Sequence, residues 1–217
     1  MMIALLFLGA ALATLPPAPH WGGLNADAAN ALKAEGIRQE MYEHLAAGEV
    51  LTEQRPVPAG KTGVHLASFG IVRGPADRVW NAVTDCGRTP GFMPHIDSCA
   101  LVQPDHALLP NQRWEELGLS FRILFFKKTA RIVNEATMEA PNFLGWKQVG
   151  GDGKENQGYY RIITIAAHTQ LVVFDTLCDP GATVPGFVKN WIIKNSLPGV
   201  IEGLRQQVET QEKRHVS

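Results

Sequence analysis

The segment DPGATVPGFVKNWIIKNSLPGVIEGLRQQVE, residues 179–209, has the pattern of one long amphipathic helix near the end of the chain. Its large apolar residues are Val184, Phe187, Val188, Trp191, Ile192, Ile193, Leu197, Val200, Ile201, Leu204 and Val208. They recur every three or four positions, which is the period of one helix face. Pro198 lies in the middle, and proline removes a backbone donor and clashes with the preceding turn, so we expect a break or kink there. So apolar a helix requires a partner surface to bury it.

The partner that the sequence offers is a sheet. From Trp114 to Phe125 apolar and other residues alternate, which is typical of a half-buried antiparallel strand. One face would carry Leu117, Leu119, Phe121, Ile123 and Phe125, and the other Gly118, Ser120 and Arg122. Further strands are expected at 63–73, 97–104, 127–138, 142–149, 159–166 and 169–179, with a polar loop at 150–158. The sequence leaves open where the turn between residues 112 and 137 lies.

The remaining segments suggest helices. Residues 24–47 have a rough apolar stripe, a capping residue at Asn25 or Asp27, and Gly48 to end the helix. The segment RPVPAG, residues 55–60, follows as a connector. After the first strand, residues 76–85 and 88–96 predict two short helices. The expected order is one helix, one strand, two short helices, six strands and a long helix.

The first residues differ from the rest. Residues 3–13, IALLFLGAALA, form an apolar run that is shorter than the roughly 20 residues needed to span a bilayer. Its length fits a signal peptide, and Ala11-Leu12-Ala13 fits a cleavage site, so residues 1–13 are expected to be removed and the protein exported to the periplasm or secreted. No Lys or Arg precedes the run, which argues against export. The alternative is an apolar tail packed on a cytoplasmic domain.

Three cysteines, Cys86, Cys99 and Cys178, form neither a C-x-x-C motif nor a zinc-ligand spacing. Export would permit one disulfide, and Cys86 and Cys99 are the closest pair in sequence. We favour three buried free cysteines, because cysteine is commonly a small core residue.

Composition excludes several functions. The net charge is −1, with 45% hydrophobic and 19% charged residues, which is ordinary for a globular protein and gives no basic footprint for nucleic acid. The chain has no GxSxG, HExxH, P-loop or dinucleotide-binding motif, so no catalytic constellation, cofactor or metal site is indicated.

Residues 74–99, GPADRVWNAVTDCGRTPGFMPHIDSC, resemble the opening of the START-like superfamily, also called SRPBCC. The matching positions are Pro75, Trp80, Asp85, Pro90, Phe92 and Pro94. The last two strands and the long helix also resemble the family, at Gly158, Asp179, Pro180, Gly181, Val184, Pro185, Leu197 and Pro198. The resemblance covers about residues 60–209, and its motifs specify fold better than activity. Thr89 departs from the family, where relatives often carry an aromatic residue.

This resemblance implies an α+β helix-grip fold. A seven-stranded antiparallel sheet would wrap around a long C-terminal helix and enclose a hydrophobic tunnel, with two short helices after the first strand. The implied START-like domain spans residues 60–211, preceded by the extra helix at 24–48. Relatives include lipid-transfer domains, coenzyme-Q-binding proteins and polyketide aromatase/cyclases. In such a fold Pro198 would be either a hinge for a lid or simply the boundary between two helices.

The expected pocket wall combines the apolar face of the 114–125 strand with large residues elsewhere. It consists of Phe92, Leu117, Leu119, Phe121, Ile123, Phe125, Trp146, Tyr160, Phe174, Phe187 and Trp191. Polar residues within strands are the candidates for contact with a ligand, and His65 and Asp175 are the two we select. Asp175 interrupts an apolar strand, and because a charged side chain is rarely buried unpaired, solvent is its expected surrounding. Arg122 and Arg161 are also expected to face outwards.

Two classes of function follow. The first is a carrier that binds a lipid, quinone or polyketide-like molecule, with transient membrane contact. The second is a cyclase or dehydratase in which His65 or Asp175 acts as acid or base. The missing catalytic constellation favours the carrier. A weaker third reading is an interaction domain whose core is completely filled.

Overall fold

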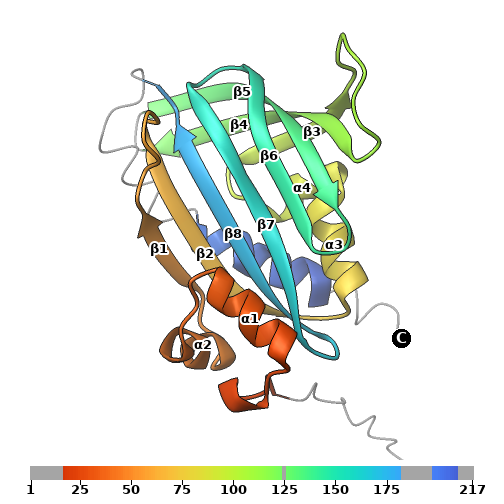
Figure 1. The fold of residues 1–217 in the computed structure, drawn as a ribbon. Coiled ribbons are helices and arrows are strands. Elements are labelled where there is room, and N and C mark those ends of the chain that lie inside the picture. The colour runs from red at the N-terminus through yellow and green to blue at the C-terminus, as the bar shows by residue number, and fades with distance from the viewer. Residues whose placement is uncertain (1–16, 124–125, 182–196, 210–217) are drawn as a thin grey trace, which may run out of the picture.

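The computed structural model describes residues 17–123, 126–181 and 197–209. It contains an eight-stranded antiparallel sheet with helices on both faces (Figure 1). The strands are β1 (Leu51–Arg55), β2 (Val64–Arg73), β3 (Ile96–Val102), β4 (Gln112–Ile123), β5 (Phe126–Glu139), β6 (Phe143–Gly151), β7 (Glu155–Ala166) and β8 (Thr169–Asp179). The helices are η1 (Trp21–Gly23), α1 (Ala26–Ala34), α2 (Gln39–Ala46), α3 (Ala76–Thr84), η2 (Cys86–Arg88) and α4 (Thr89–Phe92), followed by the C-terminal helix over residues 197–209.

The strand order in the sheet is β1-β2-β8-β7-β6-β5-β4-β3. Strands β3 to β8 follow one another as a meander, whereas α3, η2 and α4 carry the chain from β2 to the far edge at β3. The meander then returns β8 to the side of β2. In this topology β1 and β3 are the two edge strands, and each strand between them is hydrogen-bonded to a neighbour on both sides.

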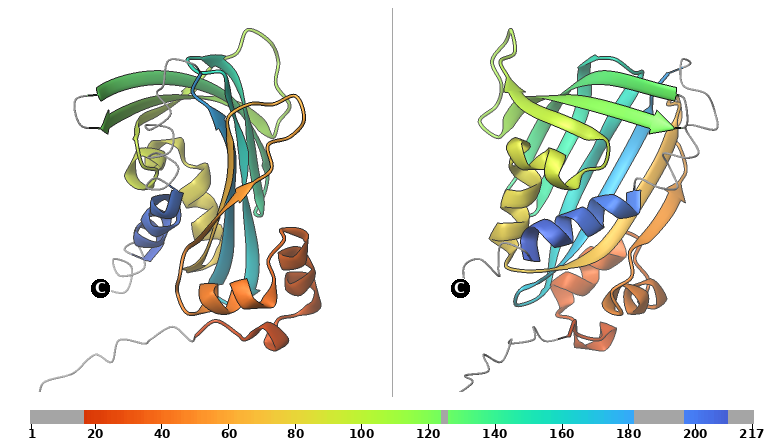
Figure 2. Two further views of the ribbon diagram at one scale, coloured as in Figure 1. Left: turned by 90° about the vertical axis from the view of Figure 1, so that its left-hand side faces the viewer. Right: turned by 180° about the vertical axis from the view of Figure 1, so that it is seen from behind.

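The sheet is strongly bent. Figure 2 shows β4 and β5 curving over the C-terminal helix, which lies across the hollow of the sheet next to α3 and α4. We call the side that carries these helices the concave face, and the side that carries α1 and α2 the convex face. Each face buries its own set of apolar residues.

Alternation along the strands separates these two cores. On β8, Val172 and Phe174 pack on the concave face, while Leu171 and Val173 pack on the convex face. When both faces of a strand are buried, apolar residues occupy successive positions and do not alternate with polar ones. This explains the apolar run in this part of the sequence.

Two glycines let the C-terminal helix approach its neighbours closely. A Cβ atom at Gly70 on β2 would collide with the side chain of Ile201. A Cβ atom at Gly203 would lie 3.0 Å from the Cα atom of Phe92 on α4. Both sites therefore require glycine for the helix to sit at its present depth.

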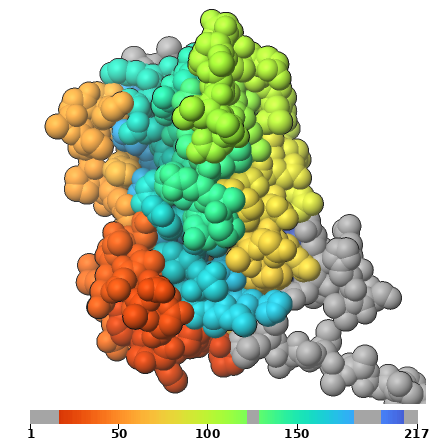
Figure 3. Space-filling model, turned by 45° about the vertical axis from the view of Figure 1, so that its right-hand side comes forward, coloured from red at the N-terminus to blue at the C-terminus, as the bar shows by residue number. Residues whose placement is uncertain are grey.

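The N-terminal region is two helices, not the single helix predicted for residues 24–47. Asn25 caps α1, since its side chain accepts a hydrogen bond of 2.8 Å from the backbone of Ala28. Gly36 follows α1 with a φ of 80°, a left-handed conformation that ends a helix. Both helices pack on the convex face, and Figure 3 shows the N-terminal segment, in red, packed against the strands.

The sheet has eight strands, so the predicted count of seven is wrong. The additional strand is β1, which ends at the first residue of the predicted connector and pairs with β2, Leu51 opposite Phe69. Its sequence, LTEQR, alternates between half-buried and exposed side chains. An edge strand with so little burial has no apolar signature.

Other boundaries also shift. Strands β6 and β7 extend into the predicted polar loop, which leaves residues 152–154 between them. Strand β4 ends at Ile123 and β5 begins at Phe126. In the C-terminal segment, Pro198 lies in the first turn of the described helix. The predicted kink concerns the residues before it, 182–196, which lie outside the described residues.

Cys86 and Cys99 form a disulfide, with their Cα atoms 5.3 Å apart. The preference for three free cysteines is therefore wrong. The error arose because Cys86, at the start of η2, is as buried as an ordinary core cysteine and is separated from Cys99 by thirteen positions in sequence. The fold brings η2 against β3 and sets the geometry that a disulfide requires.

Candidate ligand-binding cavity

A cavity of about 220 Å³ lies between the concave face, α4 and the C-terminal helix. The sheet side of the wall comes from the seven strands β2 to β8, and the C-terminal helix contributes Leu197 and Val200. Its apolar walls include Val64, Leu66, Val83, Met93, Ile96, Ile132 and Leu144. A concave, mainly apolar chamber of this kind is the usual form of a small-molecule site.

Three aromatic side chains form one wall of the cavity. The ring centroids of Tyr160 and Phe174 lie 4.9 Å apart, and each ring lies 5.6 Å from that of Trp146. Trp146 is opposite Gly158 in the β6–β7 pairing, and a Cβ atom at Gly158 would collide with the indole ring. Gly158 thus allows the tryptophan to lie flat along the sheet.

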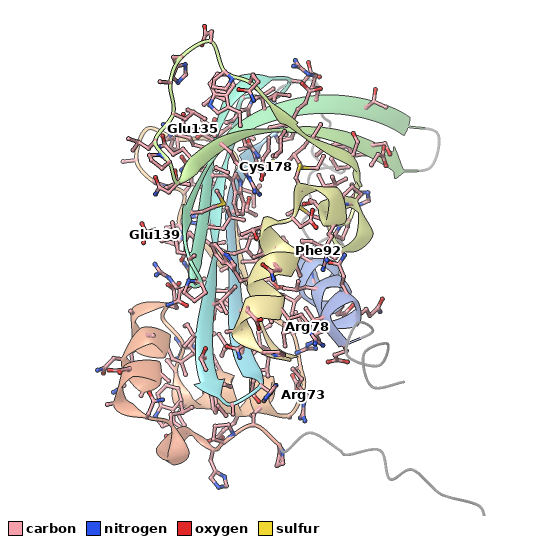
Figure 4. The ribbon with its side chains drawn as sticks, turned by 90° about the vertical axis from the view of Figure 1, so that its right-hand side faces the viewer. Arg73, Arg78, Phe92, Glu135, Glu139 and Cys178 are labelled. Carbon is pink, nitrogen blue, oxygen red and sulfur yellow. A yellow bond between two sulfur atoms is a disulfide. The ribbon has the colours of Figure 1, made fainter. Side chains whose placement is uncertain are left out.

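The cavity wall includes seven of the side chains selected from the sequence. These are Phe92, Leu117, Leu119, Phe121, Trp146, Tyr160 and Phe174. Figure 4 shows Phe92 beside the C-terminal helix and Cys178 on the sheet, and both residues contribute to the wall. The alternation predicted for the 114–125 strand therefore has the correct register at Leu117, Leu119 and Phe121. The side chain of Ile123, and residues Phe125, Phe187 and Trp191 as a whole, lie outside the described residues.

The rim of the cavity near α4 is held by the disulfide. Thr89, Phe92 and Met93 line the cavity from this short segment. The bond between Cys86 and Cys99 ties its start to β3, so the rim is fixed covalently to the edge of the sheet. Thr89, the departure from the family pattern, lies on the cavity wall.

Polar side chains enter the cavity in one row across the sheet. Glu115 on β4 is opposite Asn134 on β5, and the Asn156 amide donates a hydrogen bond of 3.0 Å to the Asn134 side-chain oxygen. We call Glu115, Asn134 and Asn156 the polar row. Arg113 neutralises its only charge, because the guanidinium Nε lies 2.7 Å from a Glu115 oxygen. The same guanidinium donates to the carbonyl oxygen of Thr84 at the end of α3.

His95 is the imidazole on the cavity wall, next to α4. Its φ of 67° lies in the left-handed region, which is uncommon for a residue with a side chain, and its ring centroid is 5.1 Å from that of Phe121. Burial lowers the pKa of the His95 imidazole, so the neutral form is favoured.

The two polar residues chosen from the sequence lie elsewhere. Asp175 is on the convex face and only 5% exposed, so the expectation that it faces solvent is wrong. Its two oxygens lie 2.7 Å from Arg55 Nη1 and 2.8 Å from His65 Nε2. Because these three side chains satisfy one another on the face opposite the cavity, His65 and Asp175 are not ligand contacts there. They tie β1, β2 and β8 together instead.

Sequence reasoning missed the polar row and His95. Asn134 interrupts the apolar face of its strand between Ile132 and Ala136, and this is a signal that alternation could have provided. Glu115 lies within the 114–125 alternation, on the same face as Leu117, but is the one charged residue on that face, and Asn156 was assigned to a loop. Arg161 does lie on the convex face, as predicted, where it pairs with Glu35 at 3.2 Å.

Two further searches concern the described parts of the chain. Within them, no three histidine, cysteine or acidic side chains come together in a way that would hold a metal ion. No helix in those same segments is long and apolar enough to cross a membrane.

Residues 72–205 match the family model described as polyketide cyclase / dehydrase and lipid transport. This match spans more than half of the chain, and the protein therefore belongs to this family. No curated protein sequence matches the chain.

Solved structures share its fold. The human StAR-related lipid transfer protein 5 is 13% identical, with a TM-score of 0.60 over 86% of this chain and 99% of that one. A STAR-related lipid transfer protein from Xanthomonas axonopodis is also 13% identical, with a TM-score of 0.59 over 74% and 93% of the two chains. The Zhui aromatase/cyclase of a Streptomyces species is 12% identical, with a TM-score of 0.52 over 70% and 95%. These likenesses establish the START-type helix-grip fold.

Proposed function

We propose that this protein binds a hydrophobic small molecule in the cavity between the concave face and the C-terminal helix. The observation that carries the proposal is the wall itself, which is apolar and aromatic on several strands and on α4 at once. Family membership supports it, since the family is described by lipid transport as well as by cyclisation. The names of two structural relatives, both lipid transfer proteins, agree with this choice.

The physical basis is desolvation. Removing apolar surface from water contributes about 25 cal/mol per Å². A largely apolar ligand gains this on entering, and few polar groups in the wall need to lose hydration in return. Binding without transformation is the simplest function of such a cavity, so we regard the protein as a carrier or sensor of its ligand.

The test is a titration with the uncharged fluorescent dye Nile red. Leu117→Trp adds bulk inside the cavity and should weaken dye binding by about tenfold or more, which corresponds to about 1.4 kcal/mol. Leu101→Trp is the matched control, because Leu101 is 62% exposed on neighbouring strand β3. The proposal fails if the wild type shows no saturable binding, or if the two variants bind the dye equally well.

A second candidate is an enzyme that acts on a hydrophobic substrate by acid–base catalysis. The observation that favours it is His95, an imidazole on the cavity wall in an uncommon backbone conformation, whose pKa burial lowers. Wild type and His95→Gln would each be incubated with ligand extracted from the purified protein, and the products compared by mass spectrometry. A change in mass or isomer that only the wild type produces would support catalysis, and unchanged ligand in both would support the carrier.

We also propose that the chain is exported after removal of residues 1–13. The Cys86–Cys99 disulfide supports this, because disulfides persist in oxidising compartments and are rare in the cytosol. Cell fractionation and N-terminal sequencing of the native protein test the proposal. A start near Thr14 in the exported fraction is expected, and an intact Met1 in the cytoplasmic fraction would refute it.

A further inference from the structure

Two adjacent tyrosines on β7 differ in how their hydroxyl groups are satisfied. Tyr159 is on the convex face and donates a hydrogen bond of 2.7 Å to a Glu35 oxygen. Tyr160 lines the cavity and is 4% exposed, and its hydroxyl has no hydrogen-bond partner among the described residues. Buried polar groups are almost always paired in native proteins, so a missing partner in a ligand cavity requires an explanation.

The cavity that Tyr160 lines also carries polar side chains. The polar row crosses the same face of the sheet, with Asn134 3% exposed and bonded to Asn156. Thr176 and Cys178 continue the polar lining onto β8. An amide pair offers donors and acceptors together, so a ligand group that both donates and accepts can be accommodated beside it.

Charge on the wall is low and internally balanced. Among the described lining residues Glu115 is the one carboxylate, and no lysine or arginine lines the cavity with it. Arg113 already holds Glu115 at 2.7 Å, and the Thr84 carbonyl takes up the other side of its guanidinium. Among the described lining residues a buried carboxylate or phosphate on a ligand would therefore lack a cation, which makes its desolvation costly.

We propose that the ligand carries one neutral hydrogen-bonding group on an apolar body, and that this group binds at Tyr160 and the polar row. Hydroxyl, ketone and carboxamide groups meet this description. Free fatty acids and phospholipid head groups do not, and an ammonium group would find Glu115 already paired with Arg113. This inference rests on the proposed function and specifies the class of molecule that fills the same cavity.

The state of Tyr160 agrees with a donor role. Burial raises the pKa of the Tyr160 hydroxyl well above its ordinary value, and the nearby Glu115 carboxylate adds to the increase. The phenol therefore keeps its proton throughout the physiological range. It can donate to a carbonyl or hydroxyl oxygen of the ligand, and this exchange costs little because the group gives up no hydrogen bond within the described part of the protein.

The experiment compares naphthalene derivatives of one shape as competitors of bound Nile red at pH 7.5. The series is naphthalene, 2-naphthol, 2-naphthamide, 2-naphthoate and 2-naphthylmethylammonium. The amide and the carboxylate are nearly isosteric, so their difference isolates charge. We expect the affinities of the naphthol and the amide to be at least about tenfold higher than those of naphthoate and the ammonium ion. They should also be several-fold higher than the affinity of naphthalene.

Two conservative variants locate the contact. Tyr160→Phe should weaken the naphthol and the amide by about three- to tenfold and leave naphthalene unchanged, without lowering the stability of the ligand-free protein. Tyr159→Phe is the matched control, one residue away on the other face. It should lower stability through loss of the Glu35 hydrogen bond and leave every affinity within twofold.

The outcomes separate this inference from the proposed function. If naphthoate or the ammonium ion competes as well as the amide, or if all five compounds bind equally, the neutral polar group is refuted while an apolar cavity stands. An unchanged amide affinity in Tyr160→Phe also refutes it. If no compound displaces the dye and the dye itself does not bind, both proposals fail together.

Discussion

The convex and concave faces of the sheet are built from the same strands, but helices fill the convex face, whereas a cavity remains on the concave face. On the convex face, α1 and α2 cover residues such as Phe69 and Leu171, both 0% exposed. On the concave face, residues such as Phe174 and Leu144 are nearly as buried, yet they surround a cavity of about 220 Å³. Burial alone therefore does not distinguish a filled core from a binding site.

Polar groups distinguish the faces more clearly. On the convex face Arg55, His65 and Asp175 satisfy one another, and Glu35 pairs with both Tyr159 and Arg161. Together these contacts join β1 and the end of α1 to the central strands. Such a network is costly to disrupt, because removing one member leaves a buried charge without its partner.

The concave face combines a hydrogen-bonded polar row with the Tyr160 hydroxyl, which has no partner in the described part of the chain. The comparison indicates that the convex face is filled and its polar groups are paired, whereas the concave face keeps a cavity and a hydroxyl group that a ligand can satisfy. Alternation along β7 and β8 assigns neighbouring residues to these two roles.

The largest effect is expected from a deletion in the filled core. Phe69→Ala should lower the free energy of unfolding by about 3–5 kcal/mol, because the void it leaves is new and the convex face cannot close over it. Denaturant unfolding measures the loss, and Nile red affinity of the folded fraction should be unchanged. A cost near zero would mean that the convex face is not tightly packed.

Removing the disulfide comes next. Replacing both Cys86 and Cys99 with serine should lower the free energy of unfolding by about 2–4 kcal/mol, because the crosslink restricts the unfolded chain. Cys178→Ser is the control, since it leaves that disulfide intact. Equal stability of wild type with and without reductant would contradict the crosslink at the cavity rim.

The matched deletion on the concave face should cost less. Phe174→Ala enlarges a cavity that already exists, so we expect a loss about 1–2 kcal/mol smaller than that of Phe69→Ala. Dye affinity should fall more than it does for any convex variant. If Phe174→Ala costs as much as Phe69→Ala and dye binding is unaffected, the two faces are equivalent and the distinction fails.

The last prediction concerns alkaline pH, where the effect is absent at neutral pH and develops only above pH 10. Burial raises the pKa of Tyr42 to about 12, and burial with the Glu35 hydrogen bond raises the pKa of Tyr159 to about 12. Their ordinary pKa is about 10, so stability is intact below pH 10 and falls between pH 10 and 12 by up to about 1.4 kcal/mol per pH unit for each tyrosine. The chain has three tyrosines, so phenolate absorbance reports them cleanly. Titration near pH 10 in the folded protein would contradict the burial.

The sequence was a good guide to elements with strong periodicity. The alternation at Leu117, Leu119 and Phe121 gave the correct register, because one buried face leaves a clear period of two. It missed β1, because this edge strand is mostly polar and its side chains are at most half-buried, so it has no apolar alternation. It also joined α1 to α2, since Gly36 is tolerated in a helical pattern and its left-handed conformation is set by packing.

The apolar part of the candidate site was more predictable than the polar part. Large residues such as Phe92 and Trp146 are conspicuous, and the family resemblance placed them near the cavity. Asp175 looked exceptional in its strand, but a partner 120 positions earlier, Arg55, satisfies it. Asn134 and Asn156 come together only through the pairing of three strands, and no local pattern contains that information.

The most direct test of the account is to ask what the protein carries. Protein purified without detergent would be examined intact by native mass spectrometry, then extracted with organic solvent and the extract identified. We predict one apolar molecule bound per chain, with a hydroxyl, carbonyl or amide group, and a much lower occupancy in Leu117→Trp than in Leu101→Trp. Occupancy by an anionic lipid would contradict the assignment of a neutral group. An unoccupied protein that also binds neither Nile red nor any naphthyl compound would contradict the cavity's role as a binding site.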